Sequence, residues 1–375
     1  MSILHYQTLS FFDEPEHQRV RVTLLRRFYL YIPHDKLNSI ADFSVSNNDL
    51  VFDCPKDRAE RRFLDLLNNH IPELRTIVTH NKAVYIHKNS NIPLTGSLSF
   101  GLIHRGTSII EVKPETSCNL DCVYCSVNEG LSSNQTDYVV EREYLVDGFK
   151  QLADFLGVPV EAHIGVQGEP LVYAEFTELV EDLSKLDNVY QISTDTNGTL
   201  LNKPLIDRLS KYPKLRLNIS LNTLNKETAS KLAGAAYNTQ HVMNMINYAV
   251  GKVDFLIAPL YVPGYNDKEV IDVIRFVQTL PLSSKPNHPM IGIQNFMNYS
   301  TGRNPVKALT WDEFRDRLRE LEKQTGERLI LDFKKDFHVT QTKQLPKPFK
   351  KGNIITASIV ARGRYPKTGL AVAKV

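Results

Sequence analysis

EVKPETSCNLDCVYC, residues 111–125, holds three of the four cysteines in this chain of 375 residues. The spacing CxxxCxxC, at Cys118, Cys122 and Cys125, can give an iron–sulfur cluster three thiolates and leave the fourth iron without a protein ligand. Clusters that only carry electrons are usually held by four cysteines. The missing fourth thiolate therefore indicates a cluster at which chemistry takes place. The alternative, a structural zinc site, would need a fourth Cys or His at finger spacing, and the sequence has no second CxxC and no HxxxH.

Short β-branched runs and amphipathic stretches alternate along the chain around this motif. The alternation predicts an α/β fold, with a parallel sheet and helices outside it. The count fits an open six-stranded arc or a closed eight-stranded barrel, and in both the functional residues lie at the carboxyl ends of the strands. The cysteines follow the first predicted strand directly. The predicted strands are 108–113, 160–166, 189–194, 215–221, 253–259 and 290–296, and the predicted helices are 140–156, 176–186, 205–212, 242–250 and 270–280, with one more opened by a capping box at Thr310 and Glu313.

Two regions flank this α/β core, which is expected to span residues 105–340. Residues 1–104 carry mixed strand and helix signals and are predicted to form an α+β accessory region. Residues 341–375 are predicted to form a small β segment of strongly basic character. From Lys343 onward there are six lysines, two arginines and no acidic residue, so the rest of the chain has a net charge of +3 minus +8, or −5. The C-terminal segment is therefore a candidate contact for a polyanion.

The composition is that of a water-soluble globular protein, with 42% hydrophobic and 23% charged residues. No stretch approaches the roughly 20 apolar residues needed to span a membrane, and the N-terminus lacks the pattern of a signal peptide. Thiols kept free as ligands need a reducing compartment. We therefore expect a cytoplasmic protein with no membrane span.

The cysteine motif, with Tyr124 before its last cysteine, resembles that of radical S-adenosylmethionine (SAM) enzymes. The order of later motifs agrees: Gly165-Val-Gln-Gly-Glu-Pro170 is similar to the family's GGEP motif, with Gln167 in place of the first glycine. Polar turns follow at 194–198, 219–222 and 263–267, so the likeness covers roughly residues 105–300. More narrowly, phrases such as Ala-His-Ile-Gly at 162–165 resemble an archaeal group described as predicted Fe–S oxidoreductases.

The resemblance implies a partial (βα)6 barrel and two cofactors, a [4Fe–4S] cluster and SAM. Cys118, Cys122 and Cys125 would hold three irons, and SAM would chelate the fourth. One electron, from a donor of ferredoxin or flavodoxin type, would then split SAM into methionine and a 5′-deoxyadenosyl radical that takes a hydrogen atom from the substrate. The resemblance places SAM against Tyr124, Gly168, Glu169, Asp195, Asn197, Ser220 and Asn222.

Three further residues are candidates for the catalytic chemistry. His163 lies on the second predicted strand with Glu161 and Gly165 at a period of two, so it could face the barrel interior; a buried histidine with a structural partner is the alternative. Gln294, or its neighbour Asn295, should point inward from the sixth strand. Cys54 could donate a hydrogen atom to a product radical, although free cysteines are often small buried apolar side chains.

The cysteine count also limits the reaction. An auxiliary cluster would need about three more cysteines, so sulfur insertion and methylthiolation are disfavoured. The segment after Phe349 resembles the start of a TRAM domain, a small RNA-binding β-barrel, at roughly half the usual length. This favours RNA, and tRNA modification, as the function, with phosphate contacts dominating the affinity. The alternatives are an enzyme acting on a small metabolite or lipid precursor, with a structural C-terminal hairpin, and a non-enzymatic Fe–S or zinc module that binds RNA.

Overall fold

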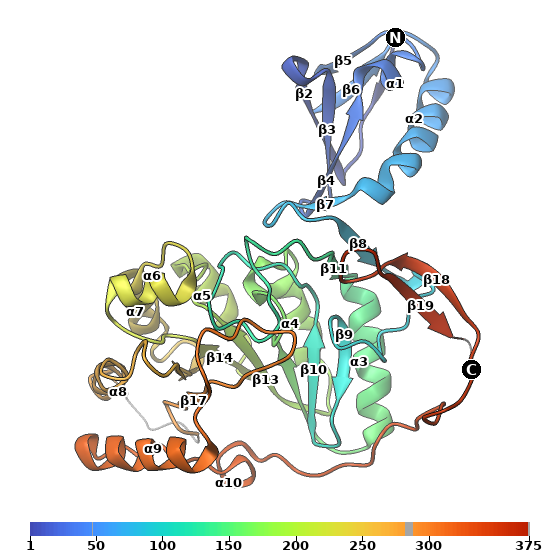
Figure 1. The fold of residues 1–375 in the computed structure, drawn as a ribbon. Coiled ribbons are helices and arrows are strands. Elements are labelled where there is room, and N and C mark those ends of the chain that lie inside the picture. Colours follow the sequence, from blue (N-terminus) through green and yellow to red (C-terminus); the bar gives the residue numbers. More distant parts are fainter. Residues whose placement is uncertain (47, 282–287, 374–375) are drawn as a thin grey trace.

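The computed structural model describes residues 1–46, 48–281 and 288–373. Its main sheet has six strands in the order β15-β14-β13-β12-β10-β9 (Figure 1). The pairs from β10 to β15 are parallel, and β9 is antiparallel to β10. The strands are β9 (Gly101–His104), β10 (Ile109–Lys113), β12 (Val160–Ile164), β13 (Val189–Thr196), β14 (Leu215–Ile219) and β15 (Asp254–Ile257). Five of the six strands expected from the sequence therefore pair as a parallel sheet.

The sixth expected strand, 290–296, is reduced to a short piece beside the sheet. β17 (Gln294–Asn295) pairs in parallel with β16 (Leu260–Tyr261), and a single bridge joins Ile257 to Ile291. The segment 291–295 therefore runs parallel to the chain after β15, but it forms only a bridge and a two-residue strand and not a full sixth strand.

Helices connect the strands, as the amphipathic pattern predicts. In α3 the side chains Leu145, Phe149, Leu152 and Leu156 are buried on one face, whereas Phe155 is exposed. The capping box at α9 is confirmed, since the Thr310 hydroxyl accepts from the Glu313 N–H and the Glu313 carboxylate accepts from the Thr310 N–H. The helices are α3 (Arg142–Leu156), α4 (Phe176–Ser184), α5 (Lys203–Leu209), α6 (Lys226–Ala233), α7 (Thr239–Ala249), α8 (Val270–Gln278), α9 (Trp311–Thr325) and α10 (Phe333–Phe337); the sequence predicted neither α6 nor α10.

The N-terminal region forms its own α+β unit. This unit lies at the end of the main sheet where β10 ends (Figure 1). One sheet has the order β1-β6-β5 and the other β2-β3-β4-β7, and α2 packs on β1 and β4. The elements are β1 (Ser2–Leu4), β2 (Leu9–Glu14), β3 (Arg19–Leu24), β4 (Phe28–Pro33), α1 (His34–Asn38), β5 (Phe43–Ser46), β6 (Asp49–Phe52), α2 (Lys56–His70) and β7 (Arg75–Thr76).

The boundary expected at residue 104 is too late. β8 (Ala83–Ile86) pairs with β11 (Asp137–Val140), and β9 is part of the main sheet. A strand is predicted at 83–87, where β8 lies, but β9 has only four residues, which is too short for a periodic signal. The partners of both strands lie on the other side of the expected boundary.

The C-terminal segment is a two-stranded antiparallel hairpin of β18 (Ala357–Arg362) and β19 (Gly369–Ala373). It lies beside β8 and β11 in Figure 1, and the Tyr138 hydroxyl on β11 donates to the Arg362 carbonyl over 3.1 Å. Within the described residues, the helices are too short or too polar to cross a membrane.

Candidate active site

The three clustered cysteines lie in the wall of one cavity of about 360 Å³. Cys118 follows β10 after a short turn, and the wall opposite is built from the carboxyl ends of β12 to β15, as the parallel topology requires. The residues expected around the cofactors share this wall: Tyr124, Gly168, Glu169, Asp195, Asn197, Ser220 and Asn222, together with Gln294 and Asn295.

The cysteine loop is fixed by an arginine far along the chain. Arg303 donates from Nε to the Asn128 side chain (2.7 Å) and from Nη1 to the backbone carbonyls of Asp121 (2.7 Å) and Cys122 (3.2 Å). Its own N–H donates to the Cys125 carbonyl over 2.8 Å, and Nη2 lies 2.7 Å from the Asp121 carboxylate. One residue, through its side chain and its backbone N–H, therefore sets the path of the loop across two of the three cysteines.

Gly168 has a role that the sequence did not reveal. Its φ is +66°, and a Cβ there would lie 2.5 Å from the Ser117 carbonyl oxygen and 2.7 Å from Thr116 backbone atoms. The glycine therefore lets the β12 loop press against the backbone that leads into Cys118, a contact completed by the Glu169 N–H, which donates to the Ser117 carbonyl over 2.9 Å. The close approach is thus to the chain's own backbone.

Glu169 joins two strand ends. Its carboxylate accepts from the Thr196 hydroxyl (2.7 Å), the Asn197 N–H (2.8 Å) and the Leu171 N–H (3.0 Å). Burial raises the pKa of Glu169 to about 7, although these three donors oppose the rise. A carboxylate has about four lone-pair positions, so one acceptor position is left for a ligand in the cavity.

Tyr124 and Asn222 form one side of the cavity. The Asn222 Nδ2 donates to the Tyr124 hydroxyl over 2.6 Å, and its Oδ1 accepts from the Leu260 N–H over 2.8 Å. Asn197 is similarly occupied, since its Nδ2 donates to the Asn119 side chain over 2.9 Å. The side-chain amides of Asn222 and Asn197 are thus bound to other parts of the protein, and they fix the shape of the cavity wall.

The residues present fit a cluster held by three thiolates. Burial raises the pKa of the thiols of Cys118, Cys122 and Cys125, so these side chains would be costly as free thiolates, and a bound metal removes that cost. The Glu129 N–H donates to the Cys125 sulfur over 3.2 Å, a contact that suits a thiolate ligand. Among the described residues, no group of three or more His, Cys, Asp or Glu side chains is arranged to hold a single metal ion.

Comparison with known proteins identifies the family. A model of the radical SAM superfamily matches residues 112–277. An uncharacterized protein of Methanocaldococcus jannaschii is 37% identical over 324 residues, which cover 80% of this chain and 74% of that protein. The chain belongs to the radical SAM superfamily. It is a radical SAM enzyme, with a [4Fe–4S] cluster and SAM as its cofactors.

More distant relatives match part of this radical SAM enzyme. A GTP 3′,8-cyclase of Clostridium botulinum is 28% identical over 180 residues, or 48% of this chain and 55% of the cyclase. The GTP 3′,8-cyclase of Lactiplantibacillus plantarum is 32% identical over 44% of this chain and 52% of that enzyme. The chain thus spans about half the length of these cyclases. Among solved structures, Streptococcus suis SuiB matches with a TM-score of 0.46 at 13% identity, over 86% of this chain and 70% of SuiB.

His163 lies next to the cavity wall and reaches it through Asp195. Its Nε2 is 3.2 Å from the Asp195 carboxylate, and its Nδ1 is 2.7 Å from the Ser193 hydroxyl. Burial disfavours the charged ring, but the Asp195 carboxylate overrides this and raises the pKa of His163 to about 9. The network continues from Asp195 through Asn218 (2.9 Å) to Arg216 (3.1 Å from Asn218). Behind Asp195, the wall of the radical SAM cavity is therefore supported by a network of charged and hydrogen-bonded side chains.

The other two catalytic candidates differ in position. Gln294 is exposed and lines the cavity, and Asn295 beside it is buried, with an Oδ1 that has no hydrogen-bond partner within the described residues. Cys54 follows β6 and is buried in the core of the N-terminal region, and it is not among the residues that line the cavity. The structure brings Gln294 to the cavity and leaves Cys54 as a small core side chain.

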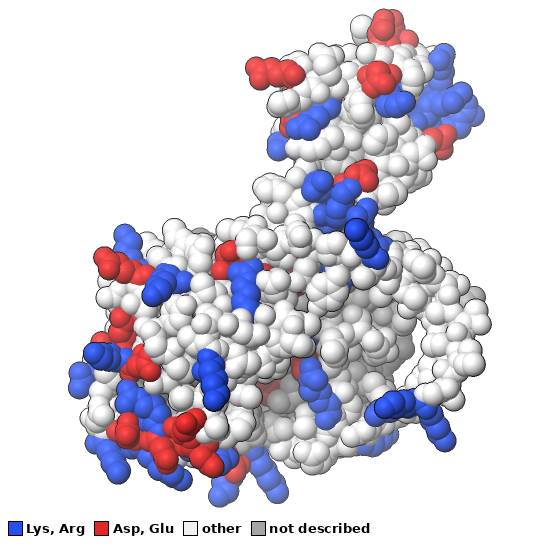
Figure 2. All heavy atoms as spheres, in the orientation of Figure 1, with Lys and Arg blue, Asp and Glu red and all other residues white. Residues whose placement is uncertain are grey.

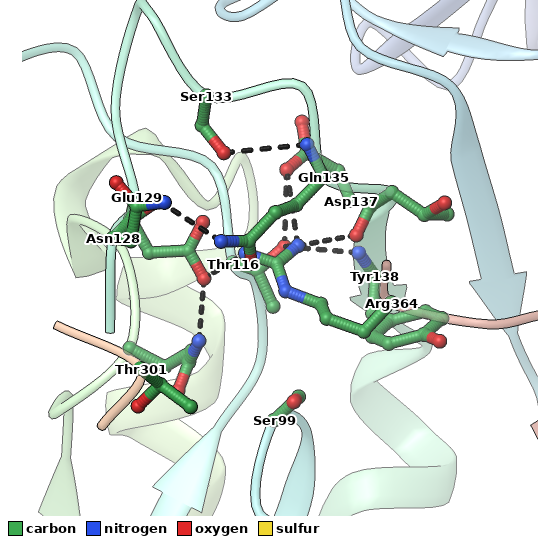
Figure 3. Close-up of polar contacts among 12 residues, drawn as sticks. Ser99, Thr116, Asn128, Glu129, Ser133, Gln135, Asp137, Tyr138, Thr301 and Arg364 are labelled. Carbon is green, nitrogen blue, oxygen red and sulfur yellow. Dashed lines mark hydrogen bonds and ion pairs between the residues drawn. The ribbon is translucent and has the colours of Figure 1, made fainter. Parts of the chain in front are cut away.

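Arg364 does not have the role that the sequence predicts for the basic C-terminal segment. It belongs to the basic C-terminal segment, but its side chain is only 7% exposed and pairs with the buried carboxylate of Glu129 (Figure 3). It also donates to the Thr136 carbonyl and, over 3.3 Å, to the Thr116 hydroxyl, and it lies 3.7 Å from Asp137. Arg364 is therefore an anchor of the cysteine loop and is not free to contact a polyanion.

Proposed function

We propose that this radical SAM enzyme modifies RNA, with tRNA as the favoured substrate. The observation that carries the proposal is the position of the basic C-terminal segment. Arg364 fixes its hairpin to the cysteine loop, while Arg362 in the hairpin and Lys350 and Lys351 before it remain exposed. An RNA held by these side chains through its phosphates would lie beside the cavity. The likeness of this segment to the start of a TRAM domain supports the same substrate class.

We infer that the chain's residues divide the work as follows. The three cysteines hold the cluster, and the free acceptor position of Glu169 receives the ammonium group of SAM. When bound, these cofactors supply a radical that abstracts a hydrogen atom from the substrate. Asp195, which is held by His163 from outside the cavity, and Gln294 face the remaining space and orient a polar substrate by hydrogen bonds. The parallel sheet, continued by β16 and β17, serves as the open (βα)6 barrel that the sequence predicts, and a ferredoxin or flavodoxin would deliver the electron.

The test is whether RNA binding and turnover depend on the hairpin. The anaerobically reconstituted enzyme is expected to retain tRNA in a salt-dependent manner, and the triple variant Lys350→Gln, Lys351→Gln, Arg362→Gln should lose most of this affinity. A matched triple on the exposed face of α9, Arg315→Gln, Arg319→Gln and Lys323→Gln, removes the same charge and should bind normally. Equal binding by the two triples would contradict the proposal.

A small nucleotide is the second candidate substrate, because the sequence match to the GTP 3′,8-cyclases covers 48% of the chain for the Clostridium botulinum enzyme and 44% for the Lactiplantibacillus plantarum enzyme. Comparative mass spectrometry of tRNA nucleosides and of small metabolites, with and without the gene, separates the two. Loss of one modified tRNA nucleoside supports the RNA substrate. A change confined to metabolites supports the nucleotide or another small substrate, and the hairpin is then a structural element.

A further inference from the structure

The N-terminal region carries a sheet face on which rings and arginines alternate. On β3 and β4 the inward side chains Val20, Val22, Leu30 and Ile32 are almost completely buried. Because strand side chains alternate between faces, the residues between them point outward. The outward set, called here the aromatic–arginine face, consists of Phe12 on β2, Arg19 and Arg21 on β3, Tyr29 and Tyr31 on β4, and Arg75 on β7.

The strand register brings these side chains into contact. Phe12 lies opposite Arg21, Arg21 opposite Tyr31, and Tyr29 opposite Arg75. The Arg21 guanidinium carbon lies 5.0 Å from the Phe12 ring centroid. Cross-strand neighbours on one face therefore form a continuous strip of rings and guanidinium planes.

Two further contacts complete the strip. The Arg19 guanidinium carbon lies 3.5 Å from the Tyr31 ring centroid, and the Tyr29 and Tyr31 centroids are 5.4 Å apart. Rings and guanidinium planes are the two kinds of side-chain surface on which unpaired bases stack.

The face is accessible, and its charge suits a polyanion. Phe12 is 40% exposed, and the other members are half-buried. Arg19, Arg21 and Arg75 outnumber the acidic Glu14, which lies 2.8 Å from Arg19 and 3.9 Å from Arg21. The opposite face is covered by α2, whose Phe63 packs on Phe11 with centroids 5.5 Å apart. The rings on the outward face are therefore not needed to close the core of this region.

The aromatic–arginine face is continuous with the basic hairpin. Arg75 on the face forms a β-bridge with Lys82, whose carbonyl accepts from the Asp137 N–H, and the neighbouring Thr136 N–H donates to the Arg364 carbonyl on the hairpin. Figure 2 shows basic side chains gathered where the N-terminal region meets the rest of the molecule.

We propose that the aromatic–arginine face binds single-stranded RNA, with bases stacked on Tyr29, Tyr31 and Phe12 and phosphates held by Arg21 and Arg75. The inference rests on the proposed RNA substrate and adds a second contact to it. The strand would run from the N-terminal region past the junction to the hairpin beside the cysteine loop. The face reads no base edges, so the affinity depends weakly on sequence.

Fluorescence anisotropy with a labelled 12-nucleotide single-stranded RNA tests the proposal on the full chain. Tyr31→Leu and Phe12→Leu keep an apolar side chain on the strand, and each is expected to weaken binding about tenfold. Tyr31→Phe should bind as the wild type does, because the ring is retained. Arg21→Gln should reduce the slope of log K against log salt by about 0.7, the loss expected for one phosphate contact to a single strand.

The control is Tyr248→Leu, which removes a half-buried ring that also lies under a lysine, on α7 and away from the face. It should bind RNA normally. Unchanged circular dichroism and iron content in all variants would show that folding is intact. If Tyr31→Leu and Phe12→Leu bind as tightly as Tyr248→Leu, the inference is wrong. A preference for duplex RNA over the single strand also overturns it, because paired bases cannot stack on the rings.

The same proteins separate this inference from the proposed function. Formation of 5′-deoxyadenosine in the presence of tRNA reports whether RNA is a substrate, whatever surface binds it. RNA-dependent turnover that survives in the Tyr31→Leu and Phe12→Leu variants with unchanged affinity would reject the face and keep the substrate. Binding to the face with no RNA-dependent turnover would reject the substrate and keep the face as a binding site.

Discussion

Replacing Arg364 by methionine should destabilise the protein by about 3 kcal/mol. The side chains of Arg364, Glu129 and Asp137 are 7%, 3% and 1% exposed, so the variant would leave two carboxylates buried without their cation. Removing one partner of a buried ion pair typically costs about 3–5 kcal/mol. The lower end applies here, because burial already raises the pKa of Glu129 to about 7 and its protonation absorbs part of the cost. Asp137 also keeps hydroxyl donors at Thr76 and Thr116.

Urea denaturation of the reduced apoprotein measures this difference, and the exposed neighbour provides the control. Arg362→Met makes the same change of charge and shape two residues away, and it should cost no more than about 0.5 kcal/mol. The iron content after reconstitution should fall in Arg364→Met alone, because the Glu129 N–H holds the Cys125 sulfur. A free energy of unfolding within about 1 kcal/mol of that of Arg362→Met would refute the anchoring role of Arg364.

Three other changes probe the cavity. Gly168→Ala would drive a Cβ into the backbone before Cys118, so we expect a large loss of both stability and iron binding, whereas Gly251→Ala, where no atom lies within 4 Å of the added Cβ, should bind iron normally. Tyr124→Phe leaves the Asn222 amide without its hydroxyl partner and should weaken SAM binding roughly fivefold, as measured by calorimetry. An unchanged affinity for SAM would show that the Tyr124–Asn222 hydrogen bond does not shape the SAM site. His163→Gln tests linkage: the folded pKa of about 9 exceeds the ordinary value of 6.5, so the stabilisation is complete below pH 6.5 and lost as the pH rises through 9. The melting temperature of the wild type should therefore fall more steeply than that of His163→Gln between those values, and parallel curves would show that Asp195 does not stabilise the imidazolium.

The parts of the site that the sequence predicts are those whose signals are local. The cysteines, the 165–170 loop and the polar ends of β13 and β14 each occupy one short segment, and the parallel topology then brings these segments to one edge of the sheet. The predicted neighbours Tyr124 and Asn222 are in contact for this reason, although 98 residues separate them. Periodicity also placed α3, α4, α5, α7 and α8 close to their observed bounds, because each one buries an apolar stripe, but it did not predict α6 or α10.

Other features depend on pairings that no local pattern encodes. Arg303 and Arg364 look like surface residues in the sequence, since nothing near them indicates that they contact a loop more than 170 residues earlier. The same holds for β9, a four-residue strand whose place is decided by its antiparallel pairing with β10. The aromatic–arginine face could have been found from its alternation, since Val20, Val22, Leu30 and Ile32 mark the inward positions on β3 and β4.

The contacts of the cysteine loop bear on when it acquires its shape. Residues 114–136 have no helix or named strand, and such a length of irregular chain needs outside ties to stay ordered. The ties come from distant segments: Arg303 binds its carbonyls, the N–H groups of Asp121 and Val123 donate to the end of α6, and Arg364 pairs with Glu129. None of these contacts uses a cysteine sulfur. We therefore expect the loop to keep its shape in the apoprotein, unlike a zinc finger, in which metal binding drives folding. It also follows that the C-terminal segment, which supplies Arg364, is part of the cluster site even though it lies some 240 residues beyond the last cysteine.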